Sequence, residues 1–122
     1  MSRKSDYVAL IKQLRENVPD ITGVMIGSVD GLAICTDFPD SEAARIAAMG
    51  ASSIGLGNRI SDTTELGGLT QMMIEGREEI LIIYMAGPGA VLALRAPVRA
   101  NLGLIRLEGA KAARRTAELV AA

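Results

Sequence analysis

The sequence predicts a mixed α/β (α+β) fold, in which helices flank one five-stranded antiparallel sheet in the order α-β-β-α-β-β-β-α. Helical and strand-like apolar patterns alternate along the 122 residues, and apolar residues make up 49% of the chain. The first two strand-like segments, and likewise the last three, are joined by connections too short for a parallel crossover, so strands joined in this way must run antiparallel. At this length we expect a single domain over residues 1–122.

The first third of the chain predicts a helix followed by a β-hairpin. Ser5 or Asp6 can cap the helix, which carries an apolar face and ends before Pro19. The pair Asp30-Gly31 between two apolar runs is typical of a type I′ turn, which needs positive φ at both central positions. The two predicted hairpin strands are residues 23–29 and 32–36.

A long helix is predicted next, from Glu42 to Asp62 or Leu66. Residues 38–41 form a loop that ends in the capping residues Asp40 and Ser41. Glycine inside a helix costs up to about 1 kcal/mol relative to alanine, so glycines here indicate close approach to another backbone. The glycines concerned are Gly50, Gly55 and Gly57.

A pair of glycines ends that helix, and the pattern then changes to three strands joined by compact turns. Strand alternation puts Met72 and Met73 on opposite faces of the sheet. Pro97 closes the last strand, and Asn101 can cap a final amphipathic helix. The three predicted strands are residues 70–75, 79–85 and 90–96.

The composition argues against nucleic acid and membrane as partners. The net charge is −1 with no run of like charge, and aromatic residues are only 2% of the chain, so neither a basic patch nor a base-stacking platform is expected. No apolar run approaches the roughly 20 residues that span a bilayer. A polar start and a single cysteine, Cys35, predict a cytoplasmic protein. Abundant alanine and glycine, with arginine outnumbering lysine, suggest a prokaryotic source.

No catalytic, cofactor-binding or metal-binding residue is predicted. The chain has no histidine, so the commonest general base and metal ligand is missing, and Cys35 has no histidine to activate it. Gly50, Gly55 and Gly57 lie inside a helix and not between a strand and a helix, which excludes a phosphate-binding loop. These observations favour a protein that is not an enzyme.

Several short segments follow one another in a characteristic order and spacing. They are Ile-Thr-Gly-Val at 21–24, Ser-Val-Asp-Gly-Leu at 28–32, the alanine-rich helix from Glu42, Ile-Glu-Gly at 74–76, Gly-Ala-Val-Leu at 89–92, and Ala-Asn-Leu-Gly-Leu-Ile-Arg-Leu-Glu at 100–108. Together they resemble the roadblock family of the dynein light chain roadblock type, which has bacterial, MglB-like members. The resemblance implies a roadblock/profilin-like fold.

The resemblance also implies a homodimer that binds a small Ras-like GTPase and scaffolds or modulates its nucleotide cycle. Family members join their sheets through the third strand and pair their long second helices. On this chain the implied dimer interface comprises Gln71, Met72, Met73, Ile74 and Glu75 of the strand, with Gly50, Ile54 and Gly57 of the helix. An unprotected edge strand and a helix rich in small residues both agree with a partner copy.

The exposed side of the long helix is the predicted GTPase-binding surface. Six residues recur there at three- and four-residue spacing: Arg45, Met49, Ser52, Leu56, Arg59 and Thr63. The alternative is that Met49 and Leu56 face the sheet and the two arginines are merely solvated. A second function also stays open, a profilin-like or PAS-like ligand-sensing module in a bacterial signalling pathway, which would need an apolar pocket with a few convergent polar groups.

Overall fold

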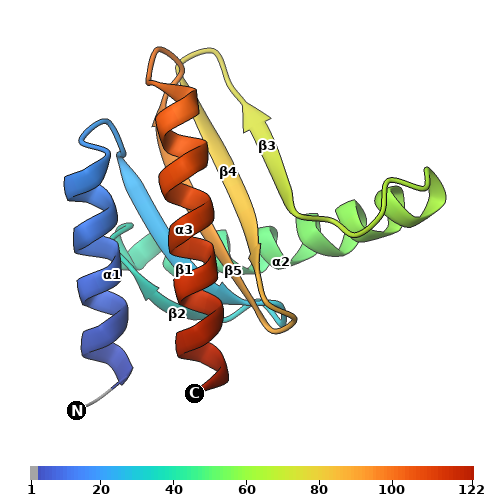
Figure 1. Ribbon diagram of the computed structural model, residues 1–122, viewed down its shortest axis with the longest axis horizontal. Helices are drawn as coiled ribbons and strands as arrows, with labels where there is room; N and C mark the ends of the chain where they lie inside the picture. Colours follow the sequence, from blue (N-terminus) through green and yellow to red (C-terminus); the bar gives the residue numbers. More distant parts are fainter. Residues whose placement is uncertain (1–2) are drawn as a thin grey trace.

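Residues 3–122, which the computed structural model describes, form helices and strands in the predicted order α-β-β-α-β-β-β-α (Figure 1). This confirms the predicted fold class. The elements are α1 (Arg3–Asn17), β1 (Gly23–Ser28), β2 (Ala33–Thr36), α2 (Asp40–Thr63), β3 (Gln71–Glu75), β4 (Glu79–Ala86), β5 (Ala90–Pro97) and α3 (Leu102–Ala121).

The five strands form one sheet in the order β2-β1-β5-β4-β3, and every neighbouring pair is antiparallel. The two eight-residue strands β4 and β5 lie near the middle and pair along their whole length. β5 pairs with β1 on its other side, although α2, β3 and β4 lie between these two strands in the sequence. The short strands β2 and β3 therefore form the two edges of the sheet.

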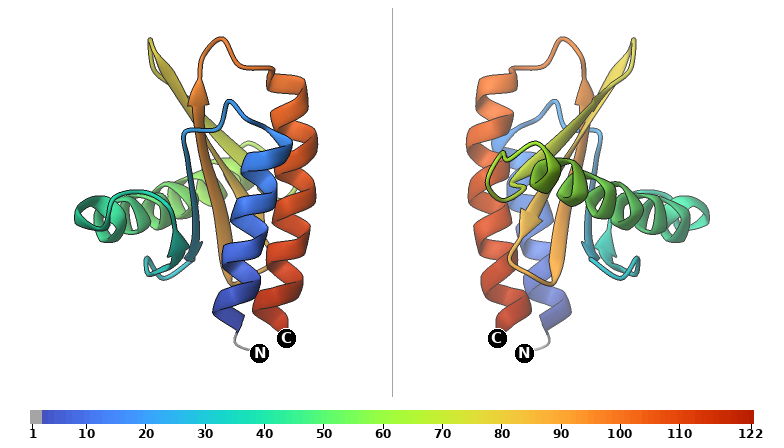
Figure 2. Two further views of the ribbon diagram at one scale, coloured as in Figure 1. Left: turned by 90° about the vertical axis from the view of Figure 1, so that its left-hand side faces the viewer. Right: turned by 90° about the vertical axis from the view of Figure 1, so that its right-hand side faces the viewer.

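Helices cover both faces of the sheet, and each face has its own apolar core. Figure 2 shows α1 and α3 together on one face and α2 on the other. The core under α1 and α3 includes Ile82, Leu92 and Ile105, none of which is measurably exposed. Met73 packs against that core and Met72 against the core under α2, so their predicted placement on opposite faces is confirmed.

The hairpin between β1 and β2 turns differently from the prediction. Gly31 has φ +96°, but Asp30 does not have positive φ, so the predicted type I′ turn is wrong. Gly31 N–H donates to the Ser28 carbonyl at 3.1 Å, and Ser28 N–H donates to the Leu32 carbonyl at 2.8 Å. The loop therefore has three residues and ends in a left-handed glycine, which is the next most common hairpin geometry.

Two helix starts also differ from the prediction. α1 begins upstream of Ser5 and Asp6, so both lie inside the helix and neither caps it. α2 begins one residue after Pro39, which occupies the N-cap position and makes no side-chain capping bond. Asp40 and Ser41 therefore lie in the first turn, where the Asp40 carboxylate still suits the positive end of the helix dipole.

The final helix, α3, packs against Tyr84 of β4. Asn101 caps α3 as predicted, because its side-chain oxygen accepts the N–H of Leu104 at 3.0 Å. Farther along α3, Gly109 lies directly against the ring of Tyr84, which is 3% exposed. A Cβ at position 109 would lie 2.6 Å from the Tyr84 hydroxyl oxygen, so only glycine fits this contact.

Candidate functional site

β3 has an open edge. It pairs with β4 on one side, and no other strand of residues 3–122 pairs with its other side. Met85 N–H donates to the Thr70 carbonyl and Gly76 N–H donates to the Glu79 carbonyl, both at 2.9 Å. Backbone groups alternate in direction along a strand, so even-numbered residues of β3 bond to β4. The backbone N–H and C=O groups that point away from the sheet belong to Gln71, Met73 and Glu75.

The C-terminal part of α2 extends past β3, the edge strand of its own sheet. The helix runs across the strands, and its C-terminal part projects past β3 (Figure 1). A Cβ at Gly57 would lie 2.6 Å from the Met72 sulfur, so α2 passes over β3 at this point. We call residues 58–66 the arm. Two large apolar side chains of the arm are exposed, Ile60 by 49% and Leu66 by 70%.

α2 leaves part of its sheet face uncovered, and a hollow of about 360 Å³ lies there. The hollow is mostly apolar, and it opens next to β3. Residues from α2 that line it include Met49, Gly50 and Ser53, and residues from the sheet include Ile74, Leu81, Ile83 and Arg95. An apolar hollow beside an open strand edge is surface that another chain could cover.

The structure separates the three α2 residues predicted for a dimer interface. Gly50 lines the hollow and has no neighbouring atom within 4 Å of its Cβ position. Ile54 and Gly57 are instead buried against their own sheet, which leaves them little surface to offer a second copy, and their role in a dimer interface stays a prediction. Of the three helical glycines only Gly57 has close neighbours, the side chains of Met72 and Leu69, because the helical period turns it toward the sheet. No backbone approaches Gly50 or Gly55 within the described chain, so their predicted close approach to another backbone stays a prediction for a second copy.

The six residues of the predicted GTPase-binding stripe are all exposed. They are Arg45, Met49, Ser52, Leu56, Arg59 and Thr63. Leu56 is 58% exposed and does not line the hollow, so the alternative that it faces the sheet is wrong. Met49 is 56% exposed but also lines the hollow, so the alternative holds in part for this residue. Arg45 forms an ion pair with Glu42 at 3.6 Å one helical turn earlier. The structure thus provides the predicted stripe, whose binding role stays a prediction.

Arg95 is held on the α2 face of the sheet by several contacts that the sequence pattern did not reveal. Its guanidinium lies 5.0 Å from the centre of the Phe38 ring. Its Nε donates to the Thr22 hydroxyl at 3.0 Å, and its Nη2 donates to the Thr22 carbonyl at 3.2 Å. Glu79 lies 3.7 Å away as an ion-pair partner. A fixed cation thus faces the apolar hollow, with 43% of its side chain exposed.

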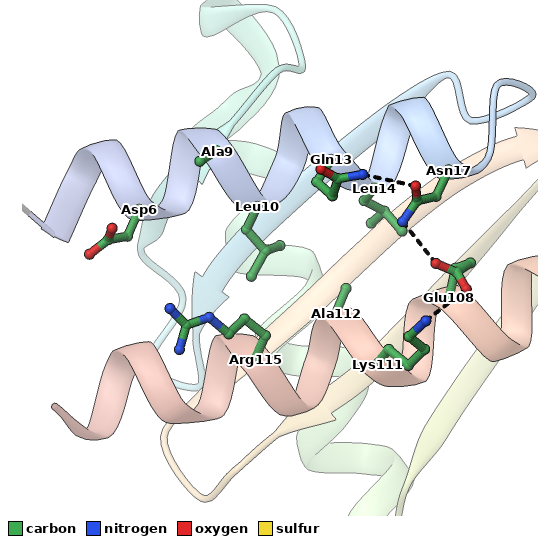
Figure 3. Close-up of a pocket in the computed structure, with 10 residues that line it drawn as sticks. All are labelled: Asp6, Ala9, Leu10, Gln13, Leu14, Asn17, Glu108, Lys111, Ala112 and Arg115. Carbon is green, nitrogen blue, oxygen red and sulfur yellow. Dashed lines mark hydrogen bonds and ion pairs between the residues drawn. The ribbon is translucent and has the colours of Figure 1, made fainter.

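A second depression, of about 450 Å³, lies between α1 and α3 on the opposite face (Figure 3). Its polar groups largely satisfy one another: Gln13 donates to Asn17 at 2.9 Å, and Asn17 donates to Glu108 at 2.9 Å. Lys111 donates to Glu108 at 3.3 Å. The sequence did not predict this depression, because it depends on how helices from opposite ends of the chain pack together.

Metal-ligating side chains, the single cysteine and the apolar length of the helices bear on what the described residues can do. Within residues 3–122, no group of three or more His, Cys, Asp or Glu side chains could hold a metal ion. Burial raises the pKa of the Cys35 thiol, and Asp37 raises it further against the opposing charge of Lys4, so the thiol stays protonated at neutral pH. None of the helices in this part of the chain is long and apolar enough to cross a membrane.

Sequence comparison decides the family. The sequence model described as "Roadblock/LC7 domain" matches residues 7–96. The chain belongs to the roadblock/LC7 family. This confirms the resemblance that the segment order predicted, and the family is one of non-catalytic adaptors and regulators. A search of curated proteins by sequence finds no match.

Solved structures of this family share the fold. A roadblock/LC7 domain from Streptomyces avermitilis is 23% identical, with a TM-score of 0.87 over 93% of this chain and 97% of its own. A structure described as MglB with tetrameric arrangement is 16% identical, with a TM-score of 0.88 over 98% and 90% of the two chains. LokiProfilin1 is 17% identical, with a TM-score of 0.62 over 98% and 99%, so the roadblock fold here is also profilin-like.

Proposed function

We propose that this roadblock/LC7 chain is a homodimeric adaptor that binds a small Ras-like GTPase and scaffolds or modulates its nucleotide cycle. The observation that carries the proposal is the open β3 edge beside an apolar hollow that α2 leaves uncovered. Membership of a family that regulates GTPases supports the choice of partner. In this proposal the chain acts in the cytoplasm, as one domain over residues 1–122, without catalysis or cofactor.

The register of the proposed dimer follows from the outward-pointing backbone groups of β3. A two-fold axis at Met73 pairs it with the same residue of the second copy and pairs Gln71 with Glu75. This register uses all five residues of the strand and satisfies the odd-numbered N–H and C=O groups in both copies. Registers centred on Met72 or Ile74 leave some of these groups unpaired.

A disulfide measures this register directly. In a chain that also carries Cys35→Ala, Met73→Cys is expected to form a disulfide-linked dimer under mild oxidation. Directly paired residues of this kind have Cα atoms about 5.5 Å apart, within disulfide range. Glu75→Cys is the matched control, because its two copies would lie about four residues apart along the strands. A Met73→Cys chain that stays uncrosslinked and sediments as a monomer at micromolar concentration would refute the dimer.

Two glycines of α2 make a second test. Gly50→Leu is expected to weaken the dimer about tenfold or more, since overpacking typically costs about 1–3 kcal/mol. The leucine fits the protomer, where nothing lies within 4 Å of the Cβ position, but it occupies the hollow. Gly55→Leu is the control, because that position is equally open and does not line the hollow. Sedimentation equilibrium gives both dissociation constants, and equal values for the two variants would contradict the expectation.

The hollow also favours one alternative function, a profilin-like ligand-sensing module. An apolar cavity of about 360 Å³ with one fixed cation matches the usual form of a small-molecule site. An amphipathic anion bound there would compete with the second copy for the same surface. Mass spectrometry of small molecules released from denatured protein tests this alternative, which predicts a stoichiometric apolar anion in place of a dimer.

A further inference from the structure

We propose that Arg95 of each protomer receives the negatively charged C-terminal end of the partner's α2. The two arms would then be exchanged across the dimer, each held by one ion-pair contact. This inference rests on the β3-centred dimer proposed above and adds to it a specific contact between the two copies.

The path of the partner's helix follows from the sheet register. Within one protomer, α2 passes over β3 at Met72. With a two-fold axis at Met73, Met72 of the second copy lies opposite Ile74 of the first. The α2 of the second copy, continuing past its own Met72, therefore passes over β3 of the first copy at Ile74. The cross-strand neighbours of Ile74 are Leu81 on β4 and then Arg95 on β5. The partner's arm therefore runs along a row of the sheet that ends at Arg95.

The length of the arm matches this path. α2 continues for six residues from Gly57 to Thr63, which corresponds to about 9 Å of helix. The partner's arm would start over the partner's β3 and pass over β3 and β4 of the first copy to reach its β5. This path is three strand spacings, or about 14 Å. The following residues, to Glu65 and Leu66, and the long side chain of Arg95 span the remainder. On the way, Ile60 and Leu66 of the arm would cover the apolar hollow.

The charges at the two ends are complementary. The last turn of α2 has no basic residue, and the exposed acidic residues Asp62 and Glu65 lie at the negative end of the helix dipole. Arg95 is fixed beforehand by Phe38, Thr22 and its ion pair with Glu79, so little conformational entropy is lost when a second carboxylate arrives. A pre-positioned guanidinium and an acidic helix end without a basic residue in its last turn are electrostatically complementary.

A double-mutant cycle on the full chain tests the contact. Asp62→Lys with Glu65→Lys is expected to raise the dimer dissociation constant about tenfold, as is Arg95→Met. The combined variant should be little weaker than either alone, because both changes remove the same interaction. The matched control is Asp30→Lys with Asp40→Lys, which makes the same charge change away from the arm and should leave the constant within about twofold.

Additive losses, or an arm variant as tight as wild type, would overturn the contact. Arg95→Met also removes bonds to Thr22, so its folding is checked by circular dichroism. If it does not fold, Arg95→Gln replaces it in the cycle, because this change removes the charge but keeps side-chain N–H donors, and the same non-additivity is expected. The Met73→Cys crosslink separates the two proposals: a crosslinked dimer without coupling refutes only the Arg95 contact, whereas no crosslink refutes the dimer itself.

Discussion

Gly109→Ala is expected to lower the free energy of unfolding by about 3 kcal/mol, a large part of the stability of a domain this size. The new methyl group would lie 2.6 Å from the Tyr84 hydroxyl oxygen and 2.7 Å from two ring carbons. Tyr84 is 3% exposed and donates to the Ile105 carbonyl at 3.4 Å, so the ring cannot move aside freely. Either α3 shifts away from β4 or the buried tyrosine adopts a strained position.

Urea unfolding measures this loss, and the same helix offers a control. Gly103→Ala is also a glycine-to-alanine change in α3, but the nearest atom to its Cβ position is the Asn101 side-chain oxygen, at an ordinary 3.5 Å. This variant should be neutral or more stable by up to about 1 kcal/mol, from helix propensity alone. A Gly109→Ala chain as stable as wild type would show that α3 does not rest on Tyr84.

The second large effect is expected at the partner surface. Changing both Arg45 and Arg59 to Glu should weaken binding of a small Ras-like GTPase by about a hundredfold or more. Both arginines lie on the exposed stripe of α2, which alternates apolar and basic side chains. Arginine and methionine are both enriched at protein interfaces. In the proposed dimer, antiparallel edge pairing keeps the two α2 helices on one face, so the stripe is present twice.

Calorimetric titration of the dimer with the GTPase in both nucleotide states measures this effect, and sedimentation shows whether the dimer persists. Lys12→Glu with Arg114→Glu is the matched control, because it makes the same charge change on exposed residues of the opposite helical layer. If affinity is unaltered in both states with the dimer intact, the GTPase binds elsewhere on the molecule.

The sequence predicted the fold well because its strong signals are local. Apolar alternation locates the strands along the chain, and short connections determine the antiparallel pairing of β1 with β2, β3 with β4 and β4 with β5. The pairing of β1 with β5 joins distant parts of the chain and has no such local signal. The details that failed involve single residues at element ends. Asp40 and Ser41 have capping chemistry, yet Pro39 takes the cap position; Asp30-Gly31 has turn chemistry, yet the loop includes one more residue.

The candidate site was predicted only in part, for a physical reason. Spacing along α2 was enough to predict the exposed stripe, since one helix determines it. It could not show that Ile54 and Gly57 face their own sheet, because small residues occur on more than one side of α2. The role of Arg95 depends on Thr22, Phe38 and Glu79, which come from three other parts of the chain. Residues that are this far apart in the sequence form no recognisable sequence motif.

The unequal edges of the sheet bear on aggregation. β3 has five residues, and all of them pair in regular register with β4. β2 at the opposite edge has only four residues, and its pairing with β1 contains a register shift. Short, irregular edge strands are poor templates for adding further chains. A dimer joined through β3 would expose only β2 at both ends. Sheet growth would stop after one step, which favours a closed assembly over a fibre.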